Sequence, residues 1–240
     1  RPLPVLVPGN HLFTQIACGG IHNCALDEAG KAWCWGTNSG GQLGREIDLT
    51  YSSAPVEVSG EHVFESLFAG QGDSFHTCGL KTDGSAWCWG DNRMNQLGVE
   101  QSISYSTTPL PVHGDHIFQK LALEDMATCG LDDQGRIFCW GSNQWGQLGL
   151  GAEIELSPNP TQVTIEDKVF SKMQSHDTRV CAQDLDGGTW CWGVVPVLRR
   201  ILWLPELIPV TTTLNEFSLG SGVICQLPEQ GPFSCAGNND

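Results

Sequence analysis

The stretch Cys24-Ala25-Leu26-Asp27-Glu28-Ala29-Gly30-Lys31-Ala32-Trp33-Cys34-Trp35-Gly36 contains two cysteines that are ten residues apart. The same offset recurs in four further pairs, namely Cys78–Cys88, Cys129–Cys139, Cys181–Cys191 and Cys225–Cys235. The pairs use ten of the eleven cysteines, and their first members are 54, 51, 52 and 44 residues apart. A period of about 50 residues indicates an array of repeated structural units.

Each cysteine pair flanks a turn that ends in glycine, as in Asp27–Gly30 and Lys81–Gly84. Two extended runs joined by such a turn are typical of a β-hairpin. Opposing Cβ atoms on antiparallel strands lie about 4.5–5.5 Å apart, which is near the separation that a disulfide needs. We therefore predict five disulfides, one in each hairpin. The alternatives are buried free thiols and a zinc site, but no pair has metal-ligand spacing.

Two more strand candidates precede each hairpin. The first candidate begins at a proline, at Pro4, Pro55, Pro109, Pro160 and more loosely Pro209. The second begins near a phenylalanine, at Phe13, Phe64, Phe118, Phe170 and Phe217. Four short strands are the content of one propeller blade, and no stretch has helical periodicity.

These patterns predict an all-β fold, a β-propeller of four-stranded blades that forms a single domain over residues 1–240. Its five repeats have approximate boundaries at 1–44, 45–98, 99–149, 150–193 and 194–240. We favour a closed five-bladed ring, because open sheet edges invite aggregation. The alternative is that the five repeats are part of a larger propeller.

Three copies of Gly-x-Asn-x-x-x-Gln-Leu-Gly follow the hairpins, at Gly36–Gly44, Gly90–Gly98 and Gly141–Gly149. On this motif the chain resembles the regulator of chromosome condensation repeat family over essentially all 240 residues, and more weakly toward the C-terminus. It is most similar to the cysteine-paired extracellular members, such as crinkly-like receptor ectodomains and bacterial surface proteins. The resemblance implies a propeller, usually of seven blades, that recognises proteins outside the reducing cytosol.

The composition excludes several classes of partner. The net charge is −15, with 12 basic and 27 acidic side chains, which argues against binding to nucleic acid or to anionic membranes. No apolar run approaches the length of about 20 residues that a membrane span needs, and Arg1–Pro4 opens no signal peptide. Five disulfides imply an oxidising location, which would be extracellular, at the cell surface or periplasmic.

Few residues suggest catalysis or metal binding. Ser74 and His76 superficially resemble part of a serine-protease site, but Ser74 occupies a variable repeat position that is Gly20 in the first unit. His11, His62 and His116 share one repeat slot, and Asp184–Gly187 is in the hairpin-turn slot. We therefore expect structural roles, no metal, no cofactor and no enzymatic activity.

Two groups of residues are candidates for partner binding. Tyr51 and Tyr105 lie in long polar loops at the same distance before the repeat proline, where recognition and packing are both reasonable interpretations. Arg199, Arg200 and Trp203 lie in the apolar stretch 194–208, which is either an interface or an inward patch of a degenerate blade.

The odd cysteine, Cys18, is expected to be a buried inert thiol, with an intermolecular disulfide as the alternative. Together the patterns favour a non-enzymatic extracellular or cell-surface module that binds a protein partner through propeller-face loops. The alternatives are a guanine-nucleotide exchange factor for a small GTPase and a glycan-binding propeller. The step from the resemblance to an extracellular protein-binding module is an analogy, because a fold alone does not fix function.

Overall fold

The computed structural model describes residues 6–46, 50–72, 74–195, 200–208, 214–220, 223–228 and 234–237. Within these ranges the chain contains β-strands and no α-helix, so no helix there could cross a membrane. The strands are β1 Phe13–Cys18, β2 His22–Asp27, β3 Ala32–Thr37, β4 Tyr51–Glu57, β5 Ser66–Ala69, β6 His76–Leu80, β7 Ala86–Asp91, β8 Tyr105–Pro111, β9 Phe118–Glu124, β10 Ala127–Asp132, β11 Ile137–Ser142, β12 Leu156–Val163, β13 Phe170–His176, β14 Arg179–Asp184, β15 Thr189–Val195, β16 Arg200–Ile208, β17 Leu214–Gly220, β18 Val223–Pro228 and β19 Ser234–Gly237.

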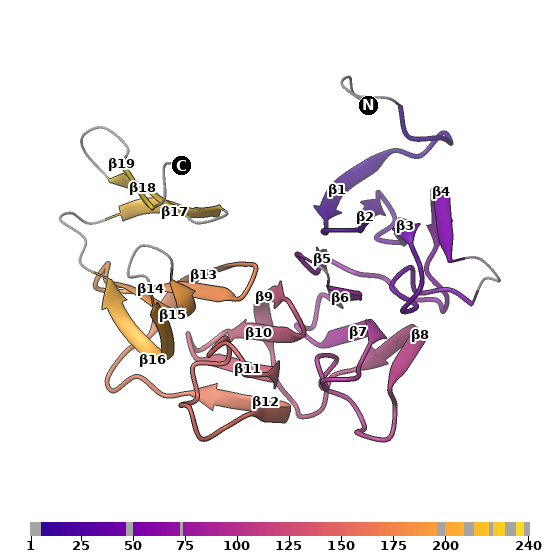
Figure 1. Ribbon diagram of the computed structural model, residues 1–240. Helices are drawn as coiled ribbons and strands as arrows, with labels where there is room; N and C mark the ends of the chain where they lie inside the picture. The colour runs from indigo at the N-terminus through magenta and orange to yellow at the C-terminus, as the bar shows by residue number, and fades with distance from the viewer. Residues whose placement is uncertain are drawn as a thin grey trace.

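The strands form five antiparallel sheets that follow one another along the chain. Four of the sheets have four strands in sequence order, and the last, β17–β18–β19, has three. The first strands of successive sheets contact one another, from β1 through β5, β9 and β13 to β17. Figure 1 shows the sheets as an arc in which β1 and β17 lie apart. Propeller blades are therefore confirmed, whereas the described residues do not show closure into a five-bladed ring.

The sheets are offset from the repeat boundaries expected from the sequence. Pro55 lies in β4, which pairs with β3 of the first sheet, and Pro109 and Pro160 lie in the outer strands β8 and β12. Each of the four four-stranded sheets therefore starts with the strand at its phenylalanine and ends with the proline strand. Proline suits an outer strand because its missing N–H is not needed there.

In the fourth sheet, the proline at the repeat position is not the one expected from the sequence. Glu206 lies opposite Cys191 in β16, as Val56 lies opposite Cys34 in β4, so Pro205 and not Pro209 occupies the repeat position. The apolar stretch 194–208 is consequently the end of β15 and all of β16. The connection between these two strands is much shorter than the Gly-x-Asn-x-x-x-Gln-Leu-Gly loops of the earlier sheets, and residues 196–199 lie outside the described ranges.

All five predicted disulfides are confirmed. In each hairpin the two cysteines lie directly opposite one another, with Cα–Cα distances of 4.0–4.1 Å. The cysteines of the first four hairpins are fully buried. Cys24 Sγ lies 4.0 Å from Thr77 Oγ1, so the first disulfide faces the second sheet. The bridges close short loops and should each contribute about 2–3 kcal/mol to the free energy of unfolding.

The three Gly-x-Asn-x-x-x-Gln-Leu-Gly loops are held by the same internal hydrogen bonds. In the first loop Asn38 Oδ1 accepts the N–H of Leu43 at 3.1 Å, and Gln42 Oε1 accepts the N–H of Gly40 at 2.9 Å. The equivalent bonds recur in the second and third loops at 2.8–3.0 Å. Gly44 closes the loop at a φ of 67°, and a Cβ there would lie 2.7 Å from Trp89 Nε1. Glycine is therefore required by conformation and by space.

The loops also join each sheet to the next. The carbonyl of Gln42 accepts hydrogen bonds from Trp89 Nε1 at 3.0 Å and from Thr77 Oγ1 at 2.9 Å. Gln96 accepts from Trp140 and Thr128 at 2.9 and 2.8 Å, and Gln147 accepts from Trp192 at 2.9 Å. The leucines of the three loops and these three tryptophans are fully buried. Each loop thus fills the space between its own sheet and the following one.

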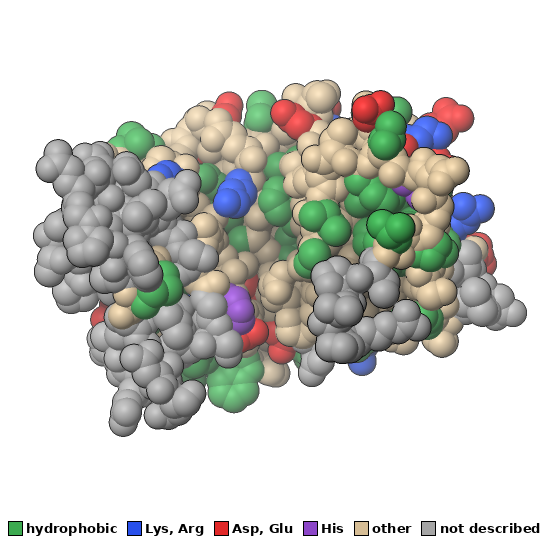
Figure 2. All heavy atoms as spheres, turned by 90° about the horizontal axis from the view of Figure 1, so that it is seen from above, with side chains coloured by type: hydrophobic (Ala, Val, Ile, Leu, Met, Phe, Trp, Pro, Cys, Tyr) green, Lys and Arg blue, Asp and Glu red, His purple; other side chains and the backbone are tan. Residues whose placement is uncertain are grey.

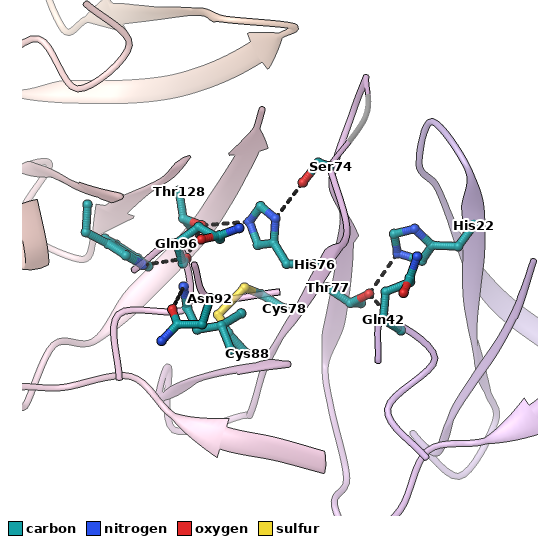
Figure 3. Close-up of a disulfide and its surroundings, with 12 residues drawn as sticks. His22, Gln42, Ser74, His76, Thr77, Cys78, Cys88, Asn92, Gln96 and Thr128 are labelled. Atoms are coloured by element: carbon teal, nitrogen blue, oxygen red, sulfur yellow. Dashed lines mark hydrogen bonds between the residues drawn. A yellow bond between two sulfur atoms is a disulfide. The ribbon is translucent and has the colours of Figure 1, made fainter. Parts of the chain in front are cut away.

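Two buried histidines extend this junction, as Figure 3 shows. His22 Nε2 lies 2.8 Å from Thr77 Oγ1 and His76 Nε2 lies 2.9 Å from Thr128 Oγ1. Each threonine hydroxyl already donates its proton to a glutamine carbonyl, so each histidine donates from Nε2. Burial lowers the pKa of His22 to about 4 and that of His76 to about 3. Both rings are therefore neutral parts of the packing.

The disulfide assignment predicts a count of reactive thiols. Alkylation of the denatured, unreduced protein should modify one cysteine, Cys18, because the other ten are bridged. Alkylation after reduction should modify all eleven. Intact-mass measurement distinguishes the two states, and eleven modified cysteines without reductant would contradict the assignment.

The buried histidines predict a pH dependence of stability. Histidine in the unfolded chain has a pKa near 6.5, whereas His22 and His76 stay neutral in the fold to about pH 4 and 3. Protons therefore bind preferentially to the unfolded chain below about pH 6.5. As the pH falls below that value, each histidine lowers the free energy of unfolding by up to about 1.4 kcal/mol per pH unit. Urea unfolding between pH 4.5 and 7 should show a shallower dependence in His76→Gln than in the wild type. His113→Gln, at an exposed position, is the control, and equal slopes in wild type and His76→Gln would refute the assignment.

Candidate functional site

The structure brings Ser74 and His76 together, but in the interior. Ser74 Oγ donates to His76 Nδ1 at 2.5 Å, and the other ring nitrogen is committed to Thr128. Ser74 is 2% exposed and His76 is fully buried. A general base must be within reach of the proton that it takes from a substrate, and this ring is not. The pair is therefore part of the inter-sheet packing.

The other histidine positions also have structural surroundings. The rings of His11, His62 and His116 contact Trp33, Trp87 and Phe138 of their neighbouring hairpins, with centroid distances of 4.2, 4.6 and 4.4 Å. Over the described ranges, no three His, Cys, Asp or Glu side chains form a group that could hold a metal ion. Asp184–Gly187 forms the turn between β14 and β15, as expected.

The connections β3–β4, β7–β8 and β11–β12 each join the end of the third strand of a sheet to the start of its fourth strand. They therefore lie at the same end of their sheets, and we call this side of the molecule the loop face. Tyr51 begins β4 opposite Thr37, and Tyr105 begins β8 opposite Asp91, so the two tyrosines occupy the same register in their sheets. They are 59% and 60% exposed. A role of these two exposed side chains in partner binding stays a prediction.

Tyr105 lines a hollow of about 410 Å³ on the loop face. Phe75 and Gly40 form part of the wall, together with an ion pair between Asp91 and Arg93. Arg93 Nε and Nη2 each lie 2.9 Å from a carboxylate oxygen of Asp91. A hollow with aromatic walls and a fixed ion pair can accept a side chain that is apolar over its body and polar at its tip.

The third loop adds an aromatic residue that the sequence analysis did not single out. Trp145 takes the position of Gly40 in the first loop and is 49% exposed. Leu156 begins β12 in the register of the two tyrosines and is 41% exposed. The signal in the sequence was a tryptophan at a variable position of an otherwise polar motif. Tyr51, Tyr105 and Trp145 together define the aromatic row of the loop face.

The second candidate group is only partly described. Trp203 lies half-buried in β16, and its carbonyl accepts the N–H of Gly151 at 2.9 Å. Arg199 lies outside the described residues, and Arg200 begins β16 with a side chain that is not described. Leu204 and Leu207 of the same strand are 57% and 54% exposed. An interface at this strand stays a prediction.

The expectation of a buried thiol at Cys18 is wrong, since the side chain is exposed. Its counterpart in the second sheet, Ala69, is 8% exposed because the first sheet lies against it, with Gly19 in close contact. None of the described residues covers Cys18 in the same way. The residue lines a groove of about 460 Å³ along the inner strands β1, β5, β9 and β13. Figure 2 shows a hollow at the surface between the sheets.

Family comparisons identify the repeat. Two models described as "Regulator of chromosome condensation (RCC1) repeat" match, one at residues 13–42 and 71–96 and the other at residues 134–182. The mouse probable E3 ubiquitin-protein ligase HERC4 is 30% identical over 172 residues, which is 70% of this chain and 15% of that protein. The mouse regulator of chromosome condensation is 31% identical over 157 residues, 64% of this chain and 37% of that protein.

Solved structures agree on the fold. Human WBSCR16 has a TM-score of 0.82 at 19% identity, over 95% of this chain and 62% of the other. Prp20p from Saccharomyces cerevisiae has a TM-score of 0.79 at 24% identity, over 94% and 57%. The ectodomain of the Physcomitrella patens receptor kinase CR4 has a TM-score of 0.62 at 21% identity, over 97% and 52%. The chain is therefore a β-propeller protein built from regulator of chromosome condensation repeats, of the type in which a cysteine pair closes each hairpin.

Proposed function

We propose that this protein is a non-enzymatic recognition module that binds a protein partner through the loop face, in an oxidising compartment outside the cytosol. The observation that carries the proposal is the aromatic row, in which Tyr51, Tyr105 and Trp145 are 59%, 60% and 49% exposed on one edge of the arc. Tyrosine and tryptophan provide large contact areas at low cost in side-chain entropy, and they dominate binding energy at many protein interfaces.

The construction of the loops supports the same proposal. Each loop is fixed by its own asparagine and glutamine side chains, and its leucine is anchored in the following sheet. A binding surface that is already ordered loses little conformational entropy when a partner docks. Loops on a rigid scaffold are also the usual place for recognition residues. The scaffold thus holds the aromatic row in a fixed arrangement before any partner arrives.

The proposed oxidising compartment is inferred from the disulfides. Ten of the eleven cysteines are paired within hairpins, and such pairs persist where the surroundings are oxidising. Among the similar structures are ectodomains of two plant receptor kinases, CR4 and ACR4. Another similar structure, Prp20p, is of a protein with binding properties to Gsp1p and histones. Protein recognition is the common feature that these comparisons support by analogy.

A second candidate is nucleotide exchange on a small GTPase, which the 31% identity to the mouse regulator of chromosome condensation favours. The disulfides argue against it, because they require a location away from a reducing cytosol. Release of a fluorescent guanine nucleotide from Gsp1p, with and without this protein, tests the candidate. We expect no acceleration, and a clear catalytic acceleration by the oxidised protein would replace the primary proposal.

The loop-face proposal predicts the effect of removing single aromatic side chains. The disulfide-intact protein is used to capture and cross-link partners from cell-surface and secreted fractions, and the affinity for the recovered partner is then measured. Tyr105→Ala should weaken binding by about tenfold or more, because it removes a wall of the hollow. The same affinity measurement on Tyr51→Ala and Trp145→Ala tests the other two members of the aromatic row.

Leu185→Ala provides the matched control. Leu185 is 72% exposed in the turn between β14 and β15, at the opposite edge of its sheet. This substitution should leave the affinity unchanged. Binding that survives all three aromatic substitutions, or that falls equally with Leu185→Ala, would show that the partner uses a different surface.

A further inference from the structure

A pocket of about 340 Å³ lies between the first and second sheets, at the end of the sheets opposite the loop face. Its walls come from the β2–β3 turn, the end of β4 and the connection over residues 58–65 that leads to β5. We call it the junction pocket. Its lining includes no member of the aromatic row, so the recognition surface proposed above does not use it.

The main chain around the junction pocket is fixed by two hydrogen bonds. The N–H of Val58 donates to the carbonyl of Ala32 at 2.9 Å, and the N–H of Phe64 donates to the carbonyl of Gly30 at 2.8 Å. The pocket lies between these two anchors, against residues 60–63 of the connection. Equivalent hydrogen bonds recur at the next junction along the chain. The pocket is therefore formed before a ligand arrives, which lowers the entropic cost of binding.

The inner wall of the pocket is apolar. It consists of Ala32, Val58 and Phe64, which are 3%, 5% and 3% exposed and belong to the hydrophobic core between the two sheets. Val63 also lines the pocket and is 55% exposed. Small-molecule sites usually combine apolar walls of this kind with a few placed polar groups. The pocket can therefore accept an apolar body such as an aromatic ring or a short branched alkyl chain.

The mouth of the pocket is charged. Lys31 Nζ lies 2.8 Å from Glu57 Oε1, and Glu61 is the second carboxylate of the lining. His62 also lines the pocket, and burial together with the nearby Lys81 ammonium lowers its pKa, so that its ring is neutral at pH 7. The mouth thus carries two negative charges and one positive charge. This balance favours a ligand with a cationic head.

The charges at the mouth are not part of the repeated frame. In the second sheet Ser85 and Pro111 take the positions of Lys31 and Glu57, although the hydrogen-bonded frame is the same. The side chains of Lys31 and Glu57 are 53% and 38% exposed, and an ion pair at such a position contributes little to stability. The charged mouth is therefore specific to the first junction, and it can be altered while the fold is kept.

We propose that the junction pocket binds a small amphipathic cation, which has an ammonium head on a short aromatic or branched alkyl body. The body contacts Val63 and the apolar inner wall, and the ammonium donates hydrogen bonds to Glu57 and Glu61. A carboxylate can accept several donors, so Glu57 can bond to the ligand and to Lys31 together. Burial of the body supplies most of the affinity, and the charge-assisted hydrogen bonds set the orientation. The site is independent of the loop face.

Three probes of similar shape test the proposal: 2-phenylethylammonium, 2-phenylethanol and 3-phenylpropionate. Each is titrated into the disulfide-intact protein at low salt and followed by ¹H–¹⁵N NMR. The ammonium should shift the amide signals of Lys31, Val63 and Phe64 and saturate with a Kd of about 1 mM or below. The alcohol should bind at least about threefold more weakly, because it lacks the charge, and the carboxylate more weakly still. Equal affinity for the three probes, or shifts confined to other surfaces, would overturn the proposal.

Charge variants test the mouth of the pocket. Glu61→Gln should weaken binding of 2-phenylethylammonium by about threefold or more and leave 2-phenylethanol unchanged, because only a negative charge is lost. Lys31→Gln should tighten binding of the ammonium, since it removes the competing cation and releases Glu57. Glu65→Gln is the matched control, because Glu65 is an exposed glutamate of the same connection that does not line the pocket. An effect of Glu61→Gln no larger than that of Glu65→Gln would overturn the assignment.

A variant of the apolar wall separates binding in the pocket from attraction to surface charge. Val63→Ser should weaken the ammonium and the alcohol by a similar factor, because both probes share the apolar body. Urea unfolding of each variant verifies that the fold is intact. Unchanged affinity of the ammonium for Val63→Ser would show that the cation binds by charge alone outside the pocket, and this result would also overturn the proposal.

Discussion

The hydrogen bond from a buried tryptophan indole to the carbonyl of a Gln-Leu-Gly loop determines how this protein is assembled. It forms between the first and second, second and third, and third and fourth sheets, each time at 2.9–3.0 Å. A buried indole that lacks an acceptor is costly, so the relative position of two sheets is fixed by this bond. The disulfides act at another level, because each one fixes the register of a single hairpin. Neighbour-to-neighbour contacts of this kind are the general basis of repeat-protein stability.

The same loops have two roles because of their geometry. Their glutamine and leucine turn inward to the next sheet, while the first two of the three variable positions between asparagine and glutamine are exposed or half-buried. Gly40, Met94 and Trp145 occupy one such position, so the surface can change without disturbing the contact between sheets. The strand that follows each loop begins with Tyr51, Tyr105 or Leu156 on the same edge. A rigid scaffold with a variable outer row suits recognition, in agreement with the proposed function.

The sequence predicts features that depend on one hairpin alone. The ten-residue offset of Cys24 and Cys34 was enough to predict their pairing, because antiparallel register is a local property. The grouping of strands into sheets was not predictable, since the sequence does not show whether a proline strand pairs with the hairpin before it or with the strands after it. The exposure of Cys18 was missed because it depends on a neighbouring sheet. Tyr51 and Tyr105 were found through their repeated spacing, whereas Trp145 occurs once and has no period to reveal it.

The central claim is that each loop holds the face of the sheet that follows it. Amide hydrogen exchange of Leu97→Ala tests it most directly, since Leu97 belongs to the second repeat but is buried against the third sheet. Removing a buried leucine costs about 2–5 kcal/mol. The account predicts that protection falls in β10 and β11 while β1 and β2 keep theirs. A loss of protection confined to β5–β8, with the third sheet unaffected, would contradict it.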